Sequence, residues 1–521
     1  MNSVNISTYK NLNRHLRYFP LIVLLILCAS ITFERLLVPK IPFGNDATLY
    51  SVIGHELLNG RLLYSDVWDH KPPAIFLTYA IAEIITGYGP QMLLFLNVSA
   101  ALVVLLGIYW AGKNSEGGPA AGLWAATFWT VLCGSYPLEG RDPNAEIFMN
   151  ACLIWAFALL VRKNDYPLGT GVSIMIGCLL TLGSFYKPIV VVYAVLFACV
   201  HILFIPKETK SRRQVIGDVL IIGLVGLLGW SAVFGYFALT DRFEIFWETM
   251  ITYNRYYSGN LFLNIIAPLR GKAVLLIDVL KPLVVLAVIG PVLTLWVNRR
   301  TGALLIAFII ATWIAIAMPG QFYSHYYQLW LPPLILGTSI FIGLLHRFLK
   351  PGFEWLPHAL GAVLLVFLGL QQLPAYRTAF SSDFYSLSDP QHITAESTAR
   401  QINAMLLPGE TFFVWGSGAI TYFWSQRRPP TAVFDTHHML AGPLADQLSA
   451  RVAENLSSDR PELFLVTGYG GYDPPLPNWI ADWLTEHYYP LASDDPKAPF
   501  KFYVRREGEL ARRIKSNSEG K

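Results

Sequence analysis

The chain has 521 residues, of which 54% are hydrophobic and only 14% are charged. Ordinary soluble domains carry about 25% charged residues, so this composition excludes a soluble enzyme and a disordered chain. The 39 Lys and Arg residues and 35 Asp and Glu residues leave a net charge of +4, too small an excess for a face that binds nucleic acid. The sequence therefore predicts a membrane protein with no nucleic-acid partner.

Eleven apolar segments have about the length of helix that crosses a bilayer core, which is roughly 20 residues. The first follows Lys10, Arg14 and Arg17 and has no small-residue cleavage site, so we interpret it as a retained anchor with a cytoplasmic N-terminus. We expect an all-α, polytopic membrane domain over residues 1–371. Its predicted spans lie near residues 18–38, 90–111, 118–136, 145–161, 168–185, 188–205, 215–240, 273–297, 301–317, 326–346 and 356–371.

The run from Ala74 to Gly87 decides the orientation of every later loop. It has about 14 residues and contains Glu83, which favours a helix lying in the membrane interface over one that spans. A short spanning helix is the alternative. Without a crossing here, the basic loops all fall on the cytoplasmic side, as the positive-inside rule requires. The long first loop, residues 39–72, then lies outside what we expect to be a bacterial inner membrane.

A polar tail follows the last span and predicts a separate extracytoplasmic α/β domain over residues 372–521. Short β-rich runs alternate in it with amphipathic segments. The predicted strands are 411–416, 431–435, 462–468 and 500–505, and the predicted helices are 393–406, 442–456 and 477–487. We interpret the adjacent His437 and His438 as surface residues, because neighbours on a helix cannot both face one ion.

The first outer loop concentrates ionisable side chains. It carries four carboxylates, and one lysine stands before a double proline; these are Asp46, Glu56, Asp66, Asp69 and Lys71. Apolar residues at helical spacing predict a helix over residues 47–59 with Asp46 at its start. Asp46 is therefore either a plain helix N-cap or a functional carboxylate.

This loop gives the chain its resemblance to a family. The segment NDATLYSVIGHELLNGRLLYSDVWDHKPPAIF, followed by DPNAEIF at 142–148, FYSHYYQLWLPPL at 322–334 and VWGSGAITYFWSQRRP at 414–429, resembles the lipid-linked sugar transferases of the GT-C fold. These include the protein mannosyltransferases and the aminoarabinose transferase of lipid A. The resemblance covers residues 18–435. It implies transfer of a sugar from a polyprenyl-phosphate donor to an acceptor hydroxyl on the non-cytoplasmic face, where the acceptor is a lipid, a glycan or a protein.

The resemblance also implies roles for individual residues. The aspartate early in the first loop is the catalytic base in such enzymes, which corresponds to Asp46. A cation must offset the charge of the departing phosphate, and Lys71 fits that role. Three further outer-face cations are candidates for the donor phosphate: Lys187, Arg255 and Arg270. The alternative for each of these is an interfacial anchor.

A second group of residues is expected to shape the sugar or acceptor pocket. It comprises Asp69, His70, Glu146, His325 and Tyr326. Some members of the family place an acidic residue before the lysine of Lys-Pro-Pro and are associated with an outer-face metal. Here that residue is His70, and loop 241–272 contains no histidine to pair with it. No metal ligand or cofactor is therefore assigned, and a divalent metal stays open.

Two other functions compete with glycosyl transfer. A transporter or flippase of lipid-linked glycans usually carries ionisable side chains in mid-helix, and here the charges gather in loops and span ends. A ligase or polymerase of surface polysaccharide would use a different donor. The sequence names neither the sugar nor the acceptor.

The predicted orientation can be tested by cysteine labelling in a cysteine-free background. Cysteines at Ser65 and Ser382 should react with an impermeant thiol reagent in intact spheroplasts, and one at Ser211 should not. Labelling at Ser211 would mean that the number of spans, or the non-spanning status of residues 74–87, is wrong.

Overall fold

The computed structural model describes residues 6–37, 44–162, 168–205, 211–380, 390–467, 476–491 and 500–519. Ser382 lies outside these ranges. The chain divides into two compact units: the first contains residues 1–39, 96–232 and 260–377, and the second contains residues 40–95, 233–259 and 378–521. The second unit therefore combines the acidic first loop, a middle segment and the polar tail.

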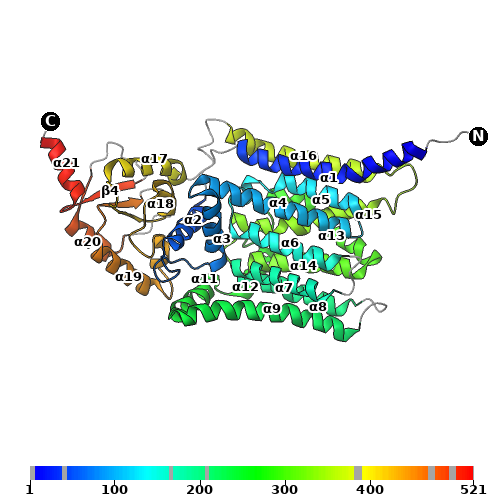
Figure 1. Ribbon diagram of the computed structural model, residues 1–521, viewed down its shortest axis with the longest axis horizontal. Coiled ribbons are helices and arrows are strands. Elements are labelled where there is room, and N and C mark those ends of the chain that lie inside the picture. The colour runs from blue at the N-terminus through cyan, green and yellow to red at the C-terminus, as the bar shows by residue number, and fades with distance from the viewer. Residues whose placement is uncertain are drawn as a thin grey trace, which may run out of the picture. The chain divides into compact units, whose positions relative to one another are not determined.

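The first unit consists of helices that run roughly parallel to one another (Figure 1). Three of its helices, α4, α9 and α16, continue into the second unit. The helices are α1 (Ile6–Leu37), α4 (Pro90–Asn114), α5 (Gly118–Leu132), α6 (Ala145–Val161), α7 (Thr170–Tyr186), α8 (Val191–Leu203), α9 (Arg212–Leu239), α12 (Leu261–Ile266), α13 (Lys281–Val297), α14 (Arg299–Ala317), α15 (Leu331–Leu345) and α16 (Leu356–Ala379), with short turns η1 (Tyr136–Leu138), η2 (Pro188–Val190), η4 (Pro268–Arg270), η5 (Asp278–Leu280) and η6 (Ser324–Trp330).

A helix lies in each of the eleven predicted segments. Within the described ranges, seven helices are long and apolar enough to cross a membrane, and four shorter apolar helices accompany them. Close contacts between the helices depend on small residues: a Cβ added at Gly290 of α13 would lie 2.1 Å from the carbonyl oxygen of Gly337 on α15. Such small-residue contacts are typical of membrane helix interfaces, where backbones approach closely.

One network of buried polar side chains joins four helices of this unit. Asp218 accepts a hydrogen bond from Ser173 (3.1 Å) and lies 3.1 Å from Nε2 of His201, and Arg300 donates to Nδ1 of the same imidazole (3.1 Å). These four residues come from α7, α8, α9 and α14. An unpaired charge would be costly in a bilayer, so this network fixes the ends of four helices.

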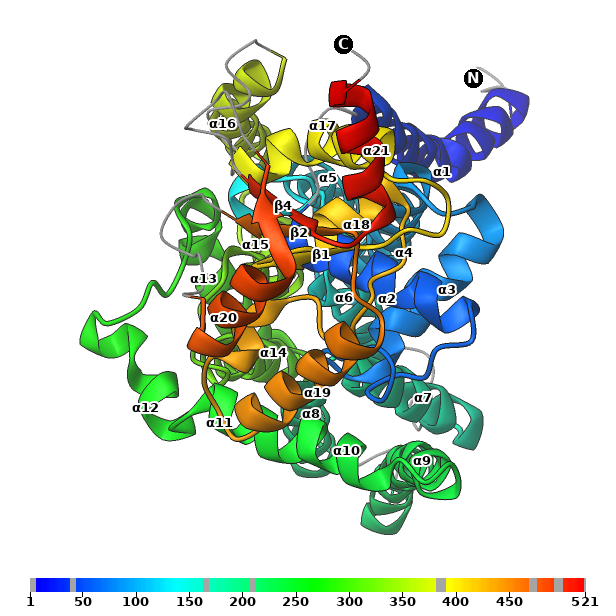
Figure 2. The same cartoon turned by 90° about the vertical axis from the view of Figure 1, so that its left-hand side faces the viewer.

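The second unit contains a four-stranded sheet and the helices around it (Figure 2). Its elements are α2 (Asn45–Leu58), α3 (Pro73–Thr86), α10 (Phe243–Trp247), the π-helix η3 (Glu248–Tyr253), α11 (Asn254–Ser258), α17 (Pro390–Met405), β1 (Phe412–Trp415), α18 (Ala419–Ser425), η8 (Thr436–Met439), α19 (Ala445–Ser458), β2 (Leu463–Thr467), α20 (Asn478–His487), β3 (Tyr488–Pro490), β4 (Phe500–Arg505) and α21 (Glu509–Glu519). The strand order is β1-β2-β4-β3; β1 and β2 are parallel, and the other two pairs are antiparallel.

The predicted strand over residues 431–435 is wrong. Residues 431–434 are buried, as the apolar pattern suggested, but their backbone bonds go elsewhere. The N–H of Ala432 donates to the side chain of Asn455, and its carbonyl accepts from the N–H of Trp68 in the first loop. The segment therefore joins the tail to the first loop, and β3 is the strand that the sequence did not predict.

Helix α2 packs against α3 and α18. One ion pair stabilises its contact with α3. Gly54 allows the close approach, because a Cβ there would lie 3.0 Å from the backbone nitrogen of Ala80. Nδ1 of His55 lies 2.7 Å from Oε1 of Glu83, and the imidazole stacks on Tyr88. The hydrogen bond to Glu83 raises the pKa of His55, although burial opposes it.

The His55–Glu83 pair predicts a pH-dependent stability. Because the pKa of His55 is raised on folding, its stabilising contribution is complete below the unfolded-state pKa of about 6.5 and is lost as the pH rises through the folded-state value. His55→Asn should therefore lower the thermal unfolding midpoint at pH 5.5 and change it little at pH 8.5. Glu83→Gln should reproduce that profile. An equal loss at both pH values would contradict the assignment.

Candidate functional site

The turn Asp69-His70-Lys71 ends the loop between α2 and α3 in the second unit. Pro72 and Pro73 begin α3, so the residue before them is held extended and outside the helix. The turn is fixed through its backbone: the Tyr64 hydroxyl donates to the carbonyl of Lys71 (2.8 Å), and the Asn254 amide donates to the carbonyl of His70 (3.0 Å). The side chains of Asp69 and His70 are buried, with 1% and 5% exposed.

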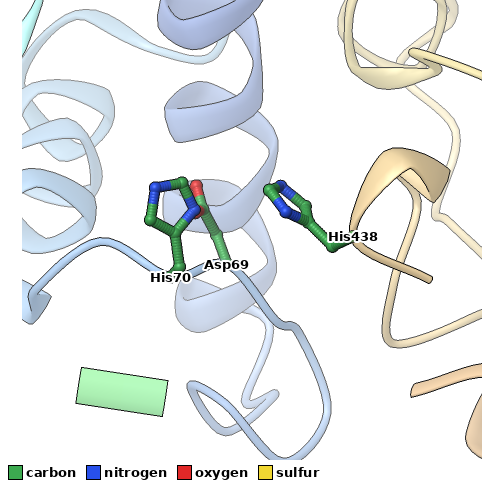
Figure 3. A group of neighbouring side chains, drawn as sticks. All are labelled: Asp69, His70 and His438. Atoms are coloured by element: carbon green, nitrogen blue, oxygen red, sulfur yellow. The ribbon is translucent and has the colours of Figure 1, made fainter. Parts of the chain in front are cut away.

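His438 completes a three-residue cluster with this turn. It stands on η8 in the tail, and its side chain points toward Asp69 and His70 (Figure 3). One donor atom from each of the three residues lies within 4.8 Å of those of the other two. The interpretation of His438 as a surface histidine is therefore wrong: it is half-buried, and it faces a carboxylate and a second imidazole.

The π-helix η3 contacts His438 and also Trp68, the residue before the turn. The hydroxyl of Tyr253 lies 2.6 Å from Nδ1 of His438, and Thr249 accepts a hydrogen bond from the indole of Trp68 (3.0 Å). Both residues belong to η3, and π-helical turns occur frequently at functional sites. The contact with Tyr253 orients the ring of His438, as partners of metal-binding histidines do.

The electrostatics of the cluster suit a cation. Burial would raise the pKa of the Asp69 carboxyl, but Lys71 and His70 hold it below its usual range. Burial lowers the pKa of His70 to about 4, and Lys71 acts in the same direction. Burial also lowers the pKa of His438. At neutral pH the cluster therefore presents one carboxylate and two neutral imidazoles.

These three residues fit a divalent metal. Oδ2 of Asp69 is buried and has no hydrogen-bond partner among the residues that the structure describes, although buried carboxylate oxygens are normally paired. Two imidazoles and one carboxylate form a common ligand set for zinc and for other transition metals. The metal that the sequence left open thus has candidate ligands in Asp69, His70 and His438.

Asp46 lies in the first turn of α2 in the same unit. The helix begins at Asn45, earlier than predicted, and its N-cap is Gly44. Asp46 is therefore not the N-cap. Its carboxylate accepts a hydrogen bond from the hydroxyl of Tyr50, a buried residue (3.1 Å). The preceding Asn45 donates to Asp435 (3.3 Å), directly before η8, so the start of α2 is joined to the tail segment that carries His438.

The first unit brings together four of the other predicted site residues. Lys187 forms an ion pair with Glu146, and its ammonium lies 3.9 Å from the centre of the Tyr326 ring. Nδ1 of the neighbouring His325 lies 3.0 Å from a carboxylate oxygen of Glu139. Glu146 is buried at the start of α6, and its second oxygen has no hydrogen-bond partner among the described residues. The cluster combines a cation with carboxylates and an aromatic face.

Two predicted phosphate-binding residues lie in neither cluster. Arg255 on α11 and Arg270 on η4 are exposed, which also fits an interfacial anchor. Conversely, the sequence reasoning did not select Tyr253 or Glu139. Neither stands in a motif, and each is identified only by the histidine that the fold places beside it.

Comparison with known proteins gives the fold. The sequence matches no protein-family model and no curated protein. The structure resembles ArnT from Cupriavidus metallidurans bound to undecaprenyl phosphate, at 14% identity and a TM-score of 0.57, over 95% of this chain and 99% of ArnT. The apo state of ArnT from the same organism matches at 12% identity and a TM-score of 0.58, over 93% of this chain and 97% of ArnT. The oligosaccharyltransferase AglB from Archaeoglobus fulgidus, in complex with an inhibitory peptide and a dolichol-phosphate, matches at 13% identity and a TM-score of 0.53, over 86% of this chain and 69% of AglB.

The predicted fold class is thereby confirmed: the chain has the GT-C fold, with a helical membrane part and a small mixed sheet. The structures that share it include two whose complexes contain a polyprenyl phosphate or a dolichol-phosphate.

Zinc titration of tag-free protein tests the proposed ligands. We expect one high-affinity Zn²⁺ site, with affinity reduced at least about tenfold in Asp69→Asn and in His438→Ala, because each removes a ligand atom. The matched control is His437→Ala, since His437 contacts Asp435 and does not belong to the cluster. Isothermal titration calorimetry measures the affinities. Equal binding by all variants, or an equal loss in His437→Ala, would contradict the site.

Proposed function

We propose that the chain is an inner-membrane glycosyltransferase that moves a sugar from a polyprenyl-phosphate donor to an acceptor hydroxyl on the extracytoplasmic face. The observation that carries the proposal is the first outer loop. There α2, which carries Asp46, contacts the tail through Asn45 and Asp435. The turn that carries Lys71 contacts the same tail segment at His438. The likeness to ArnT, which was solved with undecaprenyl phosphate, supports a polyprenyl phosphate as the carrier.

In this proposal Asp46 is the general base. The acceptor hydroxyl attacks the anomeric carbon and the bond from that carbon to the phosphate oxygen breaks, so the hydroxyl proton must pass to a nearby group. Asp46 lies in the first turn of α2, where the helix dipole favours an ionised carboxylate. The Tyr50 hydroxyl holds one of its oxygens, and Tyr50 is itself packed edge-on against Phe76 and Tyr79. The base is thus charged and oriented.

Cations of the chain stabilise the leaving phosphate. As the glycosidic bond breaks, negative charge grows on the phosphate, and a fixed cation lowers the energy of that transition state. Lys71 supplies the charge in the second unit. A divalent cation bound to Asp69, His70 and His438 would supply further positive charge.

The test of the proposal is Asp46→Asn. The substitution preserves size and removes basicity, and general-base assistance typically contributes about 10²- to 10⁴-fold in rate. We expect at least about a hundredfold loss of turnover with normal expression and thermal stability. The assay incubates purified protein with a panel of radiolabelled polyprenyl-phosphate sugars and lipid extract, and it measures the label transferred.

Two variants serve as controls. Asp446 is the second residue of the 14-residue helix α19, as Asp46 is of the 14-residue α2, and it is exposed. Asp446→Asn should leave turnover unchanged. Tyr50→Phe should reduce turnover less than Asp46→Asn does, because it frees the carboxylate without removing its charge. A folded Asp46→Asn protein with wild-type activity would remove Asp46 from the mechanism.

A further inference from the structure

The first turn of α2 is held from outside the helix. Its N-cap is Gly44, which has no side chain to accept a hydrogen bond from the first-turn amides, as Ser, Asn or Asp would. The first four amides of a helix have no partner within it, and helix ends fray. Asn45, the first residue of α2, instead donates through its side-chain amide to Oδ2 of Asp435 in the tail (3.3 Å). This contact fastens the residue directly before Asp46.

Asp435 stands in a segment whose backbone is fixed on both sides. The N–H of Gly418 donates to the carbonyl of Phe434 (3.3 Å), and the N–H of Thr436 donates to the carbonyl of Gly416 (3.2 Å). The N–H of Gly416 in turn donates to the hydroxyl of Thr436 (2.8 Å). Both glycines belong to the turn between β1 and α18. The position of Asp435 is therefore set by the sheet of the tail.

The carboxylate of Asp435 is fixed as well. Its Oδ1 lies 2.9 Å from Nδ1 of His437, and its Oδ2 accepts the bond from Asn45. The side chain is largely buried, with 14% exposed. A buried carboxylate is costly unless its oxygens are hydrogen-bonded, and hydrogen bonds to a charged group are stronger than neutral ones. Fraying of the first turn of α2 would break such a bond and is therefore opposed.

We propose that Asp435 and Asn45 are positioning residues: the tail carboxylate holds the Asn45 amide and thereby keeps Asp46 in the geometry for proton transfer. The inference rests on the proposed function, in which Asp46 is the general base. Such a base acts only within hydrogen-bond reach of the proton, and a displacement of about 1 Å costs roughly a hundredfold in rate. The polar tail thus has a role in catalysis, as the support of the helix that carries the base.

The first experiment measures kcat and KM of sugar transfer by three variants. Asn45→Ala and Asp435→Ala should each lower kcat about tenfold, the effect of losing one hydrogen bond to a charged group, and leave the KM for the donor unchanged. The double variant should be no worse than either single one, because both remove the same contact. Asp435→Asn retains an oxygen that accepts from Asn45, so it should keep most of the turnover.

Arg428→Ala is the matched control. Arg428 pairs with Glu56 near the other end of α2 (3.5 Å) and is exposed, so this variant also removes a contact between α2 and the tail. It should leave kcat unchanged, because the contact lies far along the helix from Asp46.

The second experiment requires no turnover. Hydrogen–deuterium exchange of the full-length protein in detergent micelles should be faster at the first turn of α2 in Asn45→Ala and in Asp435→Ala. In Asn45→Ala it should be unchanged in the rest of α2 and in η8, which the sheet holds in place.

Several results would overturn the proposal. They are a wild-type kcat in both single alanine variants, losses that add in the double variant, and an equal loss in Arg428→Ala. Faster exchange in η8 of Asn45→Ala, with α2 unchanged, would mean that α2 supports the tail instead. If Asp435→Ala does not fold, Asn45→Ala decides alone, since alanine is favourable in a helix.

The exchange measurement separates this proposal from the proposed function. A wild-type protein that fails every transfer assay would contradict the glycosyltransferase function, and exchange at the start of α2 would still show whether the tail holds that turn. A protein that transfers sugar equally well in both alanine variants would retain the function and contradict the positioning.

Discussion

The second unit depends on one half-buried guanidinium. Arg61 pairs with Glu56 (3.2 Å) in the first loop, and it donates to the carbonyls of Pro429 (3.0 Å) and Thr431 (3.2 Å) in the tail. A buried charge is tolerated only when it is paired and its donors are satisfied, so Arg61 stabilises one arrangement of loop and tail. His438 follows those carbonyls by a few residues. Its position beside Asp69 and His70 is a consequence of how Arg61 fixes the segment before it.

Each unit pairs its cations and carboxylates in a different way. In the first unit Lys187 is held by Glu146 and by the ring of Tyr326, which are permanent partners for an ammonium group. In the second unit Lys71 contacts a neutral imidazole, which is a weaker partner than a carboxylate for a cation.

The sequence predicted the parts whose signal is local. Apolar length located the eleven helical segments, and short β-rich runs located β1, β2 and β4. The residue order in the first loop led to Asp46 and Lys71. The prediction failed where a contact joins distant segments. The apolar residues 431–434 suggested a strand, but the backbone of Ala432 bonds to Trp68 and to the side chain of Asn455. His438 was misjudged for the same reason, since a pair of histidines carries no local sign of the carboxylate that will face one of them.

Some GT-C enzymes have an acidic residue directly before the lysine of Lys-Pro-Pro, and this chain has His70 there. The structure gives that departure a physical meaning. The carboxylate stands one residue earlier, at Asp69, and it still lowers the energy of a cation in the turn. The imidazole of His70 adds a nitrogen ligand to the carboxylate, and His438 of the tail adds a second one. A set of one carboxylate and two imidazoles suits a transition metal better than carboxylates alone do.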